Sequence, residues 1–176
     1  IRTLANKYKA PAKAILKANE DTEIRSGKWV YIPQKHGRGP LTKLHRGPAS
    51  LKNFRWPLSS KYKRVSSEFG YRWFFRNHEG IDIPAKMGSK IFAANDGIVL
   101  YSGRDVGGYG NLTVLAHPEG HFTLYAHAKR NYTKVGQQVK RGQVIGLVGK
   151  SGKATGPHLH FEIRKNDEAI NPDNFF

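Results

Sequence analysis

The chain has 176 residues, of which 30 are lysine or arginine and 13 are aspartate or glutamate, so its formal net charge is +17 with histidine neutral. This length is typical of one ordinary domain or one domain with a small companion, and a hydrophobic fraction of 38% excludes a disordered tail. No run of about 18 or more apolar residues is present, so no membrane-spanning helix is predicted. Because cysteine is absent, any metal site must use histidine, aspartate or glutamate.

Residues 1–33 form the first predicted unit, with two short helical stretches followed by a strand. Apolar residues recur at helical spacing in two short stretches up to Ala18, and Pro11 stands where a second helix could begin. The apolar, β-branched run 28–33 is predicted as a strand that ends at proline. This order of elements resembles a LysM peptidoglycan-binding module without its opening strand. It predicts a partial, small α+β LysM-like segment, and a helical appendage packed on the main domain is the alternative.

Residues 34–53 are predicted to form a basic linker, because glycine and proline are frequent and hydrophobic periodicity is weak. The basic character continues to about residue 76, with Glu68 as the single acid. This run is interpreted either as a solvated, flexible face or as an electrostatic contact with a polyanion. Five basic residues and no acidic residue fall within the linker: Lys35, Arg38, Lys43, Arg46 and Lys52.

From residue 54 to residue 176 the pattern changes to short apolar runs separated by glycine turns. Five of these runs have the β-branched and aromatic composition of strands, at 91–94, 97–101, 112–116, 122–126 and 144–148. No long amphipathic helix interrupts them. The segment is therefore predicted to be mainly β, with antiparallel sheets that form a sandwich or partial barrel.

Two polar pairs on predicted strands are candidates for chemistry. Period-2 alternation in residues 78–83 puts His78 and Asp82 on one face of the chain. The same alternation in residues 158–163 puts His158 and His160 on one face and three apolar side chains on the other. Polar pairs on buried strands are unusual without a ligand that satisfies them.

Histidine and aspartate in this pattern indicate a zinc site. Zn²⁺ binds imidazole nitrogen and carboxylate oxygen in tetrahedral geometry, and a catalytic site keeps the fourth position for water. His78, Asp82, His158 and His160 could close the site as four ligands, or one histidine could point past the metal, and spacing alone does not choose. His127, at the end of a predicted strand, is one histidine more than a closed site needs. It favours a catalytic site with a histidine that handles protons.

A series of motifs extends this interpretation to the whole segment 54–176. They are Phe69-Gly70-Tyr71-Arg72, His78-x-Gly80-x-Asp82-Ile83, Gly108-Tyr109-Gly110-Asn111, Tyr125-Ala126-His127, the run 139–146 and the run 156–162. In composition and order they resemble the motifs of the lysostaphin-type zinc metallopeptidases, peptidase family M23, also called the LytM domain. The resemblance implies a mainly β fold with a groove, one Zn²⁺ per chain and peptidoglycan as the substrate.

The resemblance also implies roles for single residues. By their positions in the motifs, His78, Asp82 and His160 correspond to the zinc ligands. His127 and His158 correspond to the catalytic pair, which polarises the attacking water and stabilises the tetrahedral oxyanion. The implied activity is a zinc-dependent endopeptidase that hydrolyses stem or cross-bridge peptide bonds of the bacterial cell wall, with D,D-cross-links favoured.

Some assignments remain open between a site role and a structural one. Asn111 and Tyr125 are candidate substrate-binding neighbours, but turn chemistry and strand packing explain them equally well. His117 and His121 are interpreted as structural histidines, as are His36 and His45. The chain begins at Ile1 without a methionine or a leader, which is typical of a mature or trimmed fragment.

Other classes of function fit the sequence less well. A non-catalytic LytM-type activator of a cell-wall amidase would lack zinc ligands or catalytic histidines, and all five positions are present. Charge alone favours a nucleic-acid binder, but neither a recognition helix nor an aromatic platform is evident. A biotin- or lipoyl-carrier domain needs characteristic residues beside its lysine, and Lys150 lacks them. We therefore expect a monomer of the cell envelope, periplasmic or secreted, that acts on peptidoglycan and not on nucleic acid.

Overall fold

The computed structural model describes residues 54–72, 76–105, 107–165 and 168–176, together with residues 2, 3, 6, 12, 13 and 16. The chain divides into two compact units, residues 1–43 and 44–176. The six described residues near the amino terminus have helical backbone. The rest of the predicted LysM-like segment and the whole basic linker lie outside the described residues, so both stay predictions. Within the described residues, no helix has the length and apolar character needed to cross a membrane.

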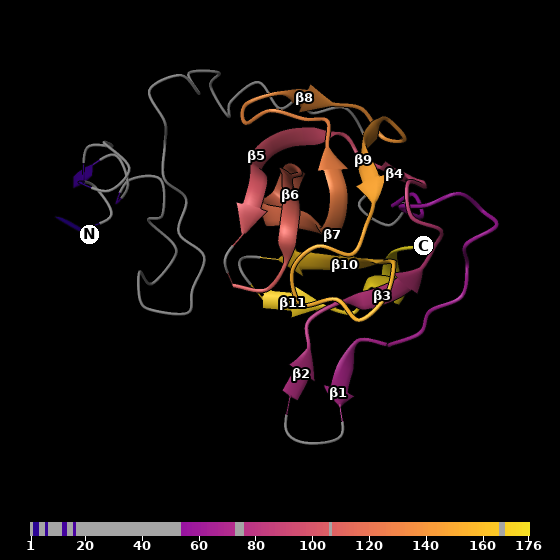
Figure 1. Cartoon of the computed structure of the whole chain (residues 1–176). Coiled ribbons are helices and arrows are strands. Elements are labelled where there is room, and N and C mark those ends of the chain that lie inside the picture. Colours follow the sequence, from indigo (N-terminus) through magenta and orange to yellow (C-terminus); the bar gives the residue numbers. More distant parts are fainter. Residues whose placement is uncertain are drawn as a thin grey trace. The chain divides into compact units, whose positions relative to one another are not determined.

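The second unit is built from short strands and brief 3-10 helices over its described residues (Figure 1). The 3-10 helices lie at Pro118–Gly120 and Pro172–Phe175. The strands are β1 (Gly70–Arg72), β2 (Arg76–His78), β3 (Ile81–Pro84), β4 (Lys90–Phe92), β5 (Gly97–Asp105), β6 (Gly110–Ala116), β7 (His121–Asn131), β8 (Gln138–Val139), β9 (Val144–Val148), β10 (His158–Lys165) and β11 (Glu168–Ile170).

Nine of these strands form one antiparallel sheet, and β1 and β2 form a separate two-stranded hairpin. The main path of the sheet runs β11-β10-β7-β6-β5-β8 (Figure 1). Two branches leave this path, because β3 pairs with β10, and β9 pairs with both β7 and β4. The prediction of a mainly β, antiparallel fold is confirmed. Each of the five predicted apolar runs coincides with or overlaps one of the strands.

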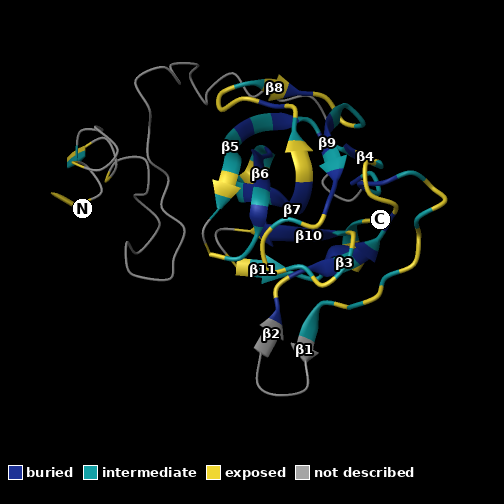
Figure 2. Cartoon of the chain, in the orientation of Figure 1, coloured by how far each residue is buried: buried dark blue, intermediate teal, exposed yellow. Residues whose placement is uncertain are grey.

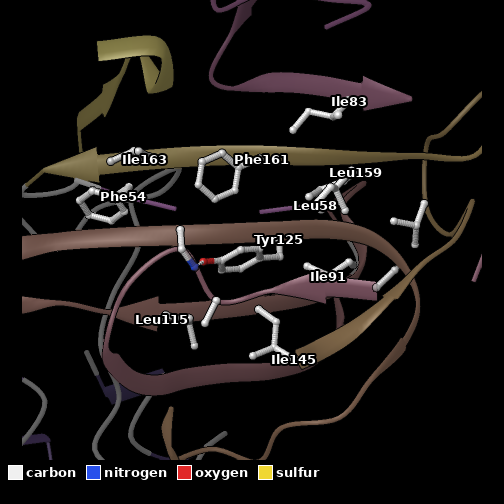
Figure 3. Packing of buried hydrophobic residues seen from close by; sticks show 14 of the residues in the cluster. Phe54, Leu58, Ile83, Ile91, Leu115, Tyr125, Ile145, Leu159, Phe161 and Ile163 are labelled. Atoms are coloured by element: carbon white, nitrogen blue, oxygen red, sulfur yellow. Dashed lines mark hydrogen bonds between the residues drawn. The ribbon is translucent and has the colours of Figure 1, made fainter. Parts of the chain in front are cut away.

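The hydrophobic core is formed by the apolar side chains of several strands. On β10, Leu159, Phe161 and Ile163 are fully buried, as the alternation predicts. They pack with residues of β3, β4, β6, β7 and β9, among them Tyr125, whose ring lies among apolar side chains (Figure 3). Buried residues follow β3, β7 and β10, whereas β8 is partly exposed (Figure 2). The polar residues of β10 therefore occupy the face opposite the core.

The segment 78–83 differs from the single strand that its alternation predicts. It contains the end of β2 at His78 and the start of β3 at Ile81, with a break at Glu79 and Gly80. The break coincides with a change of pairing partner, because His78 pairs with Gly70 of β1 and Ile81 pairs with Phe161 of β10. Gly80, within the break, also approaches the backbone of β10 closely. A Cβ atom at Gly80 would lie 3.0 Å from the carbonyl carbon of Phe161 and closer still to its oxygen. A side chain at this position would force the two segments apart.

Candidate metal centre

Three of the predicted site residues meet at one point, although they come from different strands. Antiparallel pairing of β3 with β10 puts Asp82 opposite His160. The Asp82 Oδ1 atom lies 2.8 Å from His160 Nδ1 and 3.2 Å from His78 Nε2, and the two nitrogen atoms are 3.1 Å apart. Both histidines are more than nine-tenths buried. The fold thus converts two separate sequence motifs into one cluster of donor atoms.

The remaining ring nitrogens of the two histidines hold this arrangement. His78 Nδ1 lies 2.7 Å from the carbonyl oxygen of Glu68, and His160 Nε2 lies 2.9 Å from Glu162 Oε1. Both oxygens are acceptors, so in the neutral rings each of these nitrogens carries the proton and donates it. The nitrogen that faces Asp82 then offers its lone pair. Metal-binding histidines in proteins are oriented in the same way.

The donor set and its spacing fit Zn²⁺. Ligands about 2.0–2.1 Å from a tetrahedral zinc ion are about 3.3–3.4 Å apart. The three observed separations, from 2.8 to 3.2 Å, are slightly shorter than this. Two imidazole nitrogens and one carboxylate oxygen are also the donors that zinc accepts, and three protein ligands leave a coordination position open. The residues present therefore fit a zinc ion with small outward movements.

Electrostatics in the cluster favour a cation. Burial by itself raises the pKa of Asp82, but hydrogen bonds with His160 and His78 outweigh it and hold the pKa well below its ordinary value. Burial lowers the pKa of His160, but its bonds with Asp82 and Glu162 raise it to about 9. The low pKa of Asp82 shows that its histidine partners hold it as a carboxylate, and the raised pKa of His160 shows the effect of the negative charges of Asp82 and Glu162. The same negative charge attracts a divalent metal ion.

His127 and His158 lie beside the three candidate ligands. Their ring centroids are 4.7 Å apart, and His158 Nε2 lies 3.7 Å from Asp82 Oδ1. In both rings Nδ1 donates to a backbone carbonyl, that of Ser151 for His127 at 2.8 Å and that of Gly156 for His158 at 2.9 Å. The neutral rings therefore carry their lone pair on Nε2. Burial lowers the pKa of His127 to about 4, so this ring is neutral near pH 7.

Two loops fix the position of His127, whose φ of 59° is unusual for a residue with a side chain. Its backbone N–H donates to the carbonyl of Tyr109, and its ring is held by Ser151. The loops that carry these two residues pack backbone against backbone. A Cβ atom at Gly110, where φ is 67°, would lie 2.5 Å from the backbone nitrogen of Gly152. The glycines of this motif let the two loops approach closely enough to hold the histidine.

Asn111 and Tyr125 make bonds within the sheet and the core, as the structural alternative predicts. The Asn111 amide donates to the carbonyls of Ala128 at 2.9 Å and Lys129 at 3.3 Å, across the pairing of β6 with β7. Tyr125 is only 1% exposed, and its hydroxyl accepts from the backbone N–H of Ala94 at 2.8 Å. Both side chains therefore serve the sheet and the core. His117 and His121 are also buried, in agreement with their structural interpretation.

Sequence reasoning did not assign a role to Glu162, Tyr109 or Arg164, which lie directly behind His160. The only available signal is that residues 158, 160, 162 and 164 share one face of β10. Nothing in the sequence indicates that a tyrosine from the glycine-rich motif before β6 joins this row.

The fold and the site together define a class of protein. An antiparallel β domain that gathers two histidines and one aspartate, with two more histidines beside them, has the layout of a single-metal hydrolase centre. The family model described as "Peptidase family M23" matches residues 76–172 of this chain. The chain belongs to this family, as its motifs indicate.

Individual relatives support this assignment. Over 116 residues the chain is 44% identical to the "DD-carboxypeptidase/endopeptidase Mpg" of Neisseria meningitidis, a match that covers 63% of this chain and 26% of the relative. It is 36% identical over 124 residues to the "Murein hydrolase activator NlpD" of Salmonella dublin, with 70% of this chain and 31% of the relative covered. A solved zinc-containing peptidase from Vibrio cholerae is similar, with a TM-score of 0.62, 32% identity and coverage of 68% of this chain and 39% of that one.

The chain thus spans about a quarter to a third of the length of these curated relatives. Their names describe both hydrolases and an activator. The family and the fold are therefore established, and the activity is a separate question.

Proposed function

We propose that this chain is a zinc-dependent peptidoglycan endopeptidase that hydrolyses stem or cross-bridge peptide bonds, with D,D-cross-links as the favoured substrate. The observation that carries this proposal is the convergence of His78, Asp82 and His160, with His127 and His158 beside them. Membership of a peptidase family and the similarity to a DD-carboxypeptidase/endopeptidase support it.

In this proposal His78, Asp82 and His160 hold one Zn²⁺ per chain. Such an ion supplies Lewis acidity, which lowers the pKa of water and polarises the scissile carbonyl. The backbone carbonyl of Glu68 accepts from His78 Nδ1 and keeps that imidazole ring oriented towards the ion. The chain needs no rearrangement beyond a small outward movement of the three donors.

His127 and His158 act on protons and on developing charge. Each has its Nδ1 proton committed to a backbone carbonyl, so Nε2 can accept a proton from the attacking water. Once protonated at Nε2, either ring can donate a hydrogen bond to the oxyanion or a proton to the leaving amine. Because the two histidines lie side by side, one ring can work as the base while the other donates.

A second candidate function is a non-catalytic activator of a cell-wall amidase. The similarity to a murein hydrolase activator favours it. The presence of all five predicted site residues favours the enzyme, because an activator has no need of oriented metal ligands. The two functions differ in whether the metal-loaded chain alone releases products.

The proposal places the protein in the bacterial cell envelope, periplasmic or secreted, as a monomer bound to peptidoglycan. The charge of +17 supports attraction to an anionic wall polymer. A LysM-like segment ahead of the peptidase would direct the chain to the same polymer.

The test is digestion of purified sacculi of defined cross-link chemistry, with mass analysis of the released muropeptides. We expect release that a chelator stops and added Zn²⁺ restores, and we expect Asp82→Asn to abolish it. Asp96→Asn is the matched control, because Asp96 bonds the backbone of Arg141 and the side chain of Lys140 instead. An unchanged muropeptide profile with zinc demonstrably bound would refute the enzyme. Stimulation of a purified wall amidase by that same inactive protein would establish the activator.

A further inference from the structure

A carboxylate without exposure lies directly behind the candidate ligand His160. Glu162 is 0% exposed and occupies the same face of β10 as His158 and His160. Its Oε1 atom lies 2.9 Å from His160 Nε2 and accepts from the Tyr109 hydroxyl at 2.6 Å. Its Oε2 atom accepts from Arg164 Nε at 2.6 Å. A fully buried carboxylate is unfavourable unless hydrogen-bond donors satisfy both of its oxygens. The three partners of Glu162 therefore define the position of its carboxylate.

The partners of Glu162 are themselves held in place. Arg164 is 7% exposed, and its Nη2 atom also bonds the carboxylate of Glu79 and lies 3.4 Å from the Tyr109 hydroxyl. The Tyr109 ring packs against the His160 ring, with 5.7 Å between the centroids. Glu162 therefore cannot rotate away from His160 without breaking bonds to two other side chains. A carboxylate fixed on three sides imposes one orientation on the imidazole that it contacts.

The absence of a side chain at Gly80 keeps space for this carboxylate. A Cβ atom at Gly80 would lie 2.8 Å from Glu162 Cγ. Gly80 stands between His78 and Asp82 in the sequence, so the segment that supplies two candidate ligands also leaves room for the group behind the third. The glycine of the H-x-G-x-D pattern thus lies against Glu162, one of the polar residues in the row on β10.

We propose that Glu162 is a positioning residue for metal binding and that Tyr109 and Arg164 hold it in place. By accepting the Nε2 proton of His160, Glu162 keeps the Nδ1 lone pair of that ring directed at Asp82 and His78. The inference rests on the proposed zinc site, and it concerns how tightly the chain holds zinc and not which bond it cuts. In this proposal Glu162 acts through His160 and is not itself a metal ligand.

The experiment measures the zinc affinity of the whole chain by competition with a chelating dye, without any substrate. Glu162→Gln keeps the shape of the side chain but removes its charge and points an amide donor at Arg164 or at His160. We expect its zinc dissociation constant to rise about 10- to 100-fold, the usual range for loss of such a partner. Tyr109→Phe removes one of the bonds that hold Glu162, so we expect a smaller rise in the same direction.

Tyr125→Phe is the matched control, because it removes a buried tyrosine hydroxyl on the core face of the sheet. We expect it to lower the thermal stability of the metal-free protein while its zinc affinity stays within about twofold of the parent. If Glu162→Gln does not fold, the zinc affinities of Tyr109→Phe and Tyr125→Phe are compared instead, and a weaker affinity for Tyr109→Phe supports the inference. The inference is wrong if Glu162→Gln, or in its absence Tyr109→Phe, binds zinc as tightly as the parent while Asp82→Asn does not bind it.

This result is independent of the proposed peptidase activity. A chain that binds zinc in the expected order of variants but releases no muropeptides would support the inference and refute the enzyme. If the parent chain cleaves sacculi and Glu162→Gln retains full zinc affinity, the enzyme is supported and the inference is refuted.

Discussion

Replacing Gly80 with alanine tests whether the close approach of two chain segments builds the metal centre. Gly80 lies between the two candidate ligands His78 and Asp82, and it faces β10 beside Phe161 and Glu162. Its φ is not in the left-handed region, so the substitution adds a methyl group without forcing the backbone into a strained conformation. Any effect must come from the space that the methyl group requires.

The expected displacement follows from the contacts. The new Cβ atom would lie 3.0 Å from the backbone carbonyl carbon of Phe161, closer still to its oxygen, and 2.8 Å from Glu162 Cγ, whereas non-bonded carbon atoms prefer about 3.5–4.0 Å. The two segments must therefore separate by about 1 Å. Metal–ligand distances in a working site vary by only about 0.2 Å, so His160 cannot keep its place relative to His78 and Asp82. We expect zinc affinity to fall at least tenfold, equivalent to about 1.4 kcal/mol, and the metal-free fold to lose about 1–3 kcal/mol from overpacking.

The assay is zinc competition with a chelating dye, together with chemical unfolding of the metal-free protein. Gly156→Ala is the control, because a Cβ atom there would meet nothing within 4 Å and Gly156 is also close to a site histidine, His158. We expect the control to match the parent in zinc affinity and to be as stable or slightly more stable. If Gly80→Ala binds zinc as tightly as Gly156→Ala, the close approach does not determine the metal geometry and this reasoning fails.

Three further outcomes are expected. Tyr125→Phe leaves the buried N–H of Ala94 without its acceptor and should lower the free energy of unfolding by about 1–3 kcal/mol, and an unchanged denaturation midpoint would contradict this. Burial lowers the pKa of His117 to about 4, whereas the unfolded chain takes up this proton near pH 6.5, so the folded state should lose about 3 kcal/mol as the pH falls from 7 to 4. His117→Gln should remove that part of the pH dependence, and parallel curves for the two proteins would refute it. Binding of the chain to sacculi should weaken when salt rises from about 0.05 to 0.5 M, since screening shortens the reach of its charge, and salt-independent co-sedimentation would exclude an electrostatic contribution.

The strands and their buried faces could be predicted because they depend on local pattern. Leu159, Phe161 and Ile163 alternate with polar residues, and only one face of such a strand can join a core. The break between β2 and β3 was missed for the opposite reason. Alternation continues through Gly80, and the strand is interrupted where the pairing partner changes from β1 to β10, a strand remote in the sequence.

In the candidate site, too, local features could be predicted and contacts between remote segments could not. The residue types in the two histidine motifs indicate zinc chemistry by themselves, because their donor atoms and spacing are local properties. The roles of Asn111 and Tyr125 could not be predicted, since a polar side chain near a motif can bond its own sheet as readily as a ligand. In the structure both side chains bond within the sheet or the core, and a role in substrate binding stays a prediction.

The sequence alone determined a basic, mainly β chain with the histidines and the aspartate of a metallopeptidase family. Only the tertiary structure decided that Asp82 stands opposite His160, that His127 is held between two loops, and that Glu162 fills the space that Gly80 leaves. The physical reason is distance along the chain. His78 and His160 are 82 positions apart, and periodicity tells which face a side chain occupies but not which strand lies beside it.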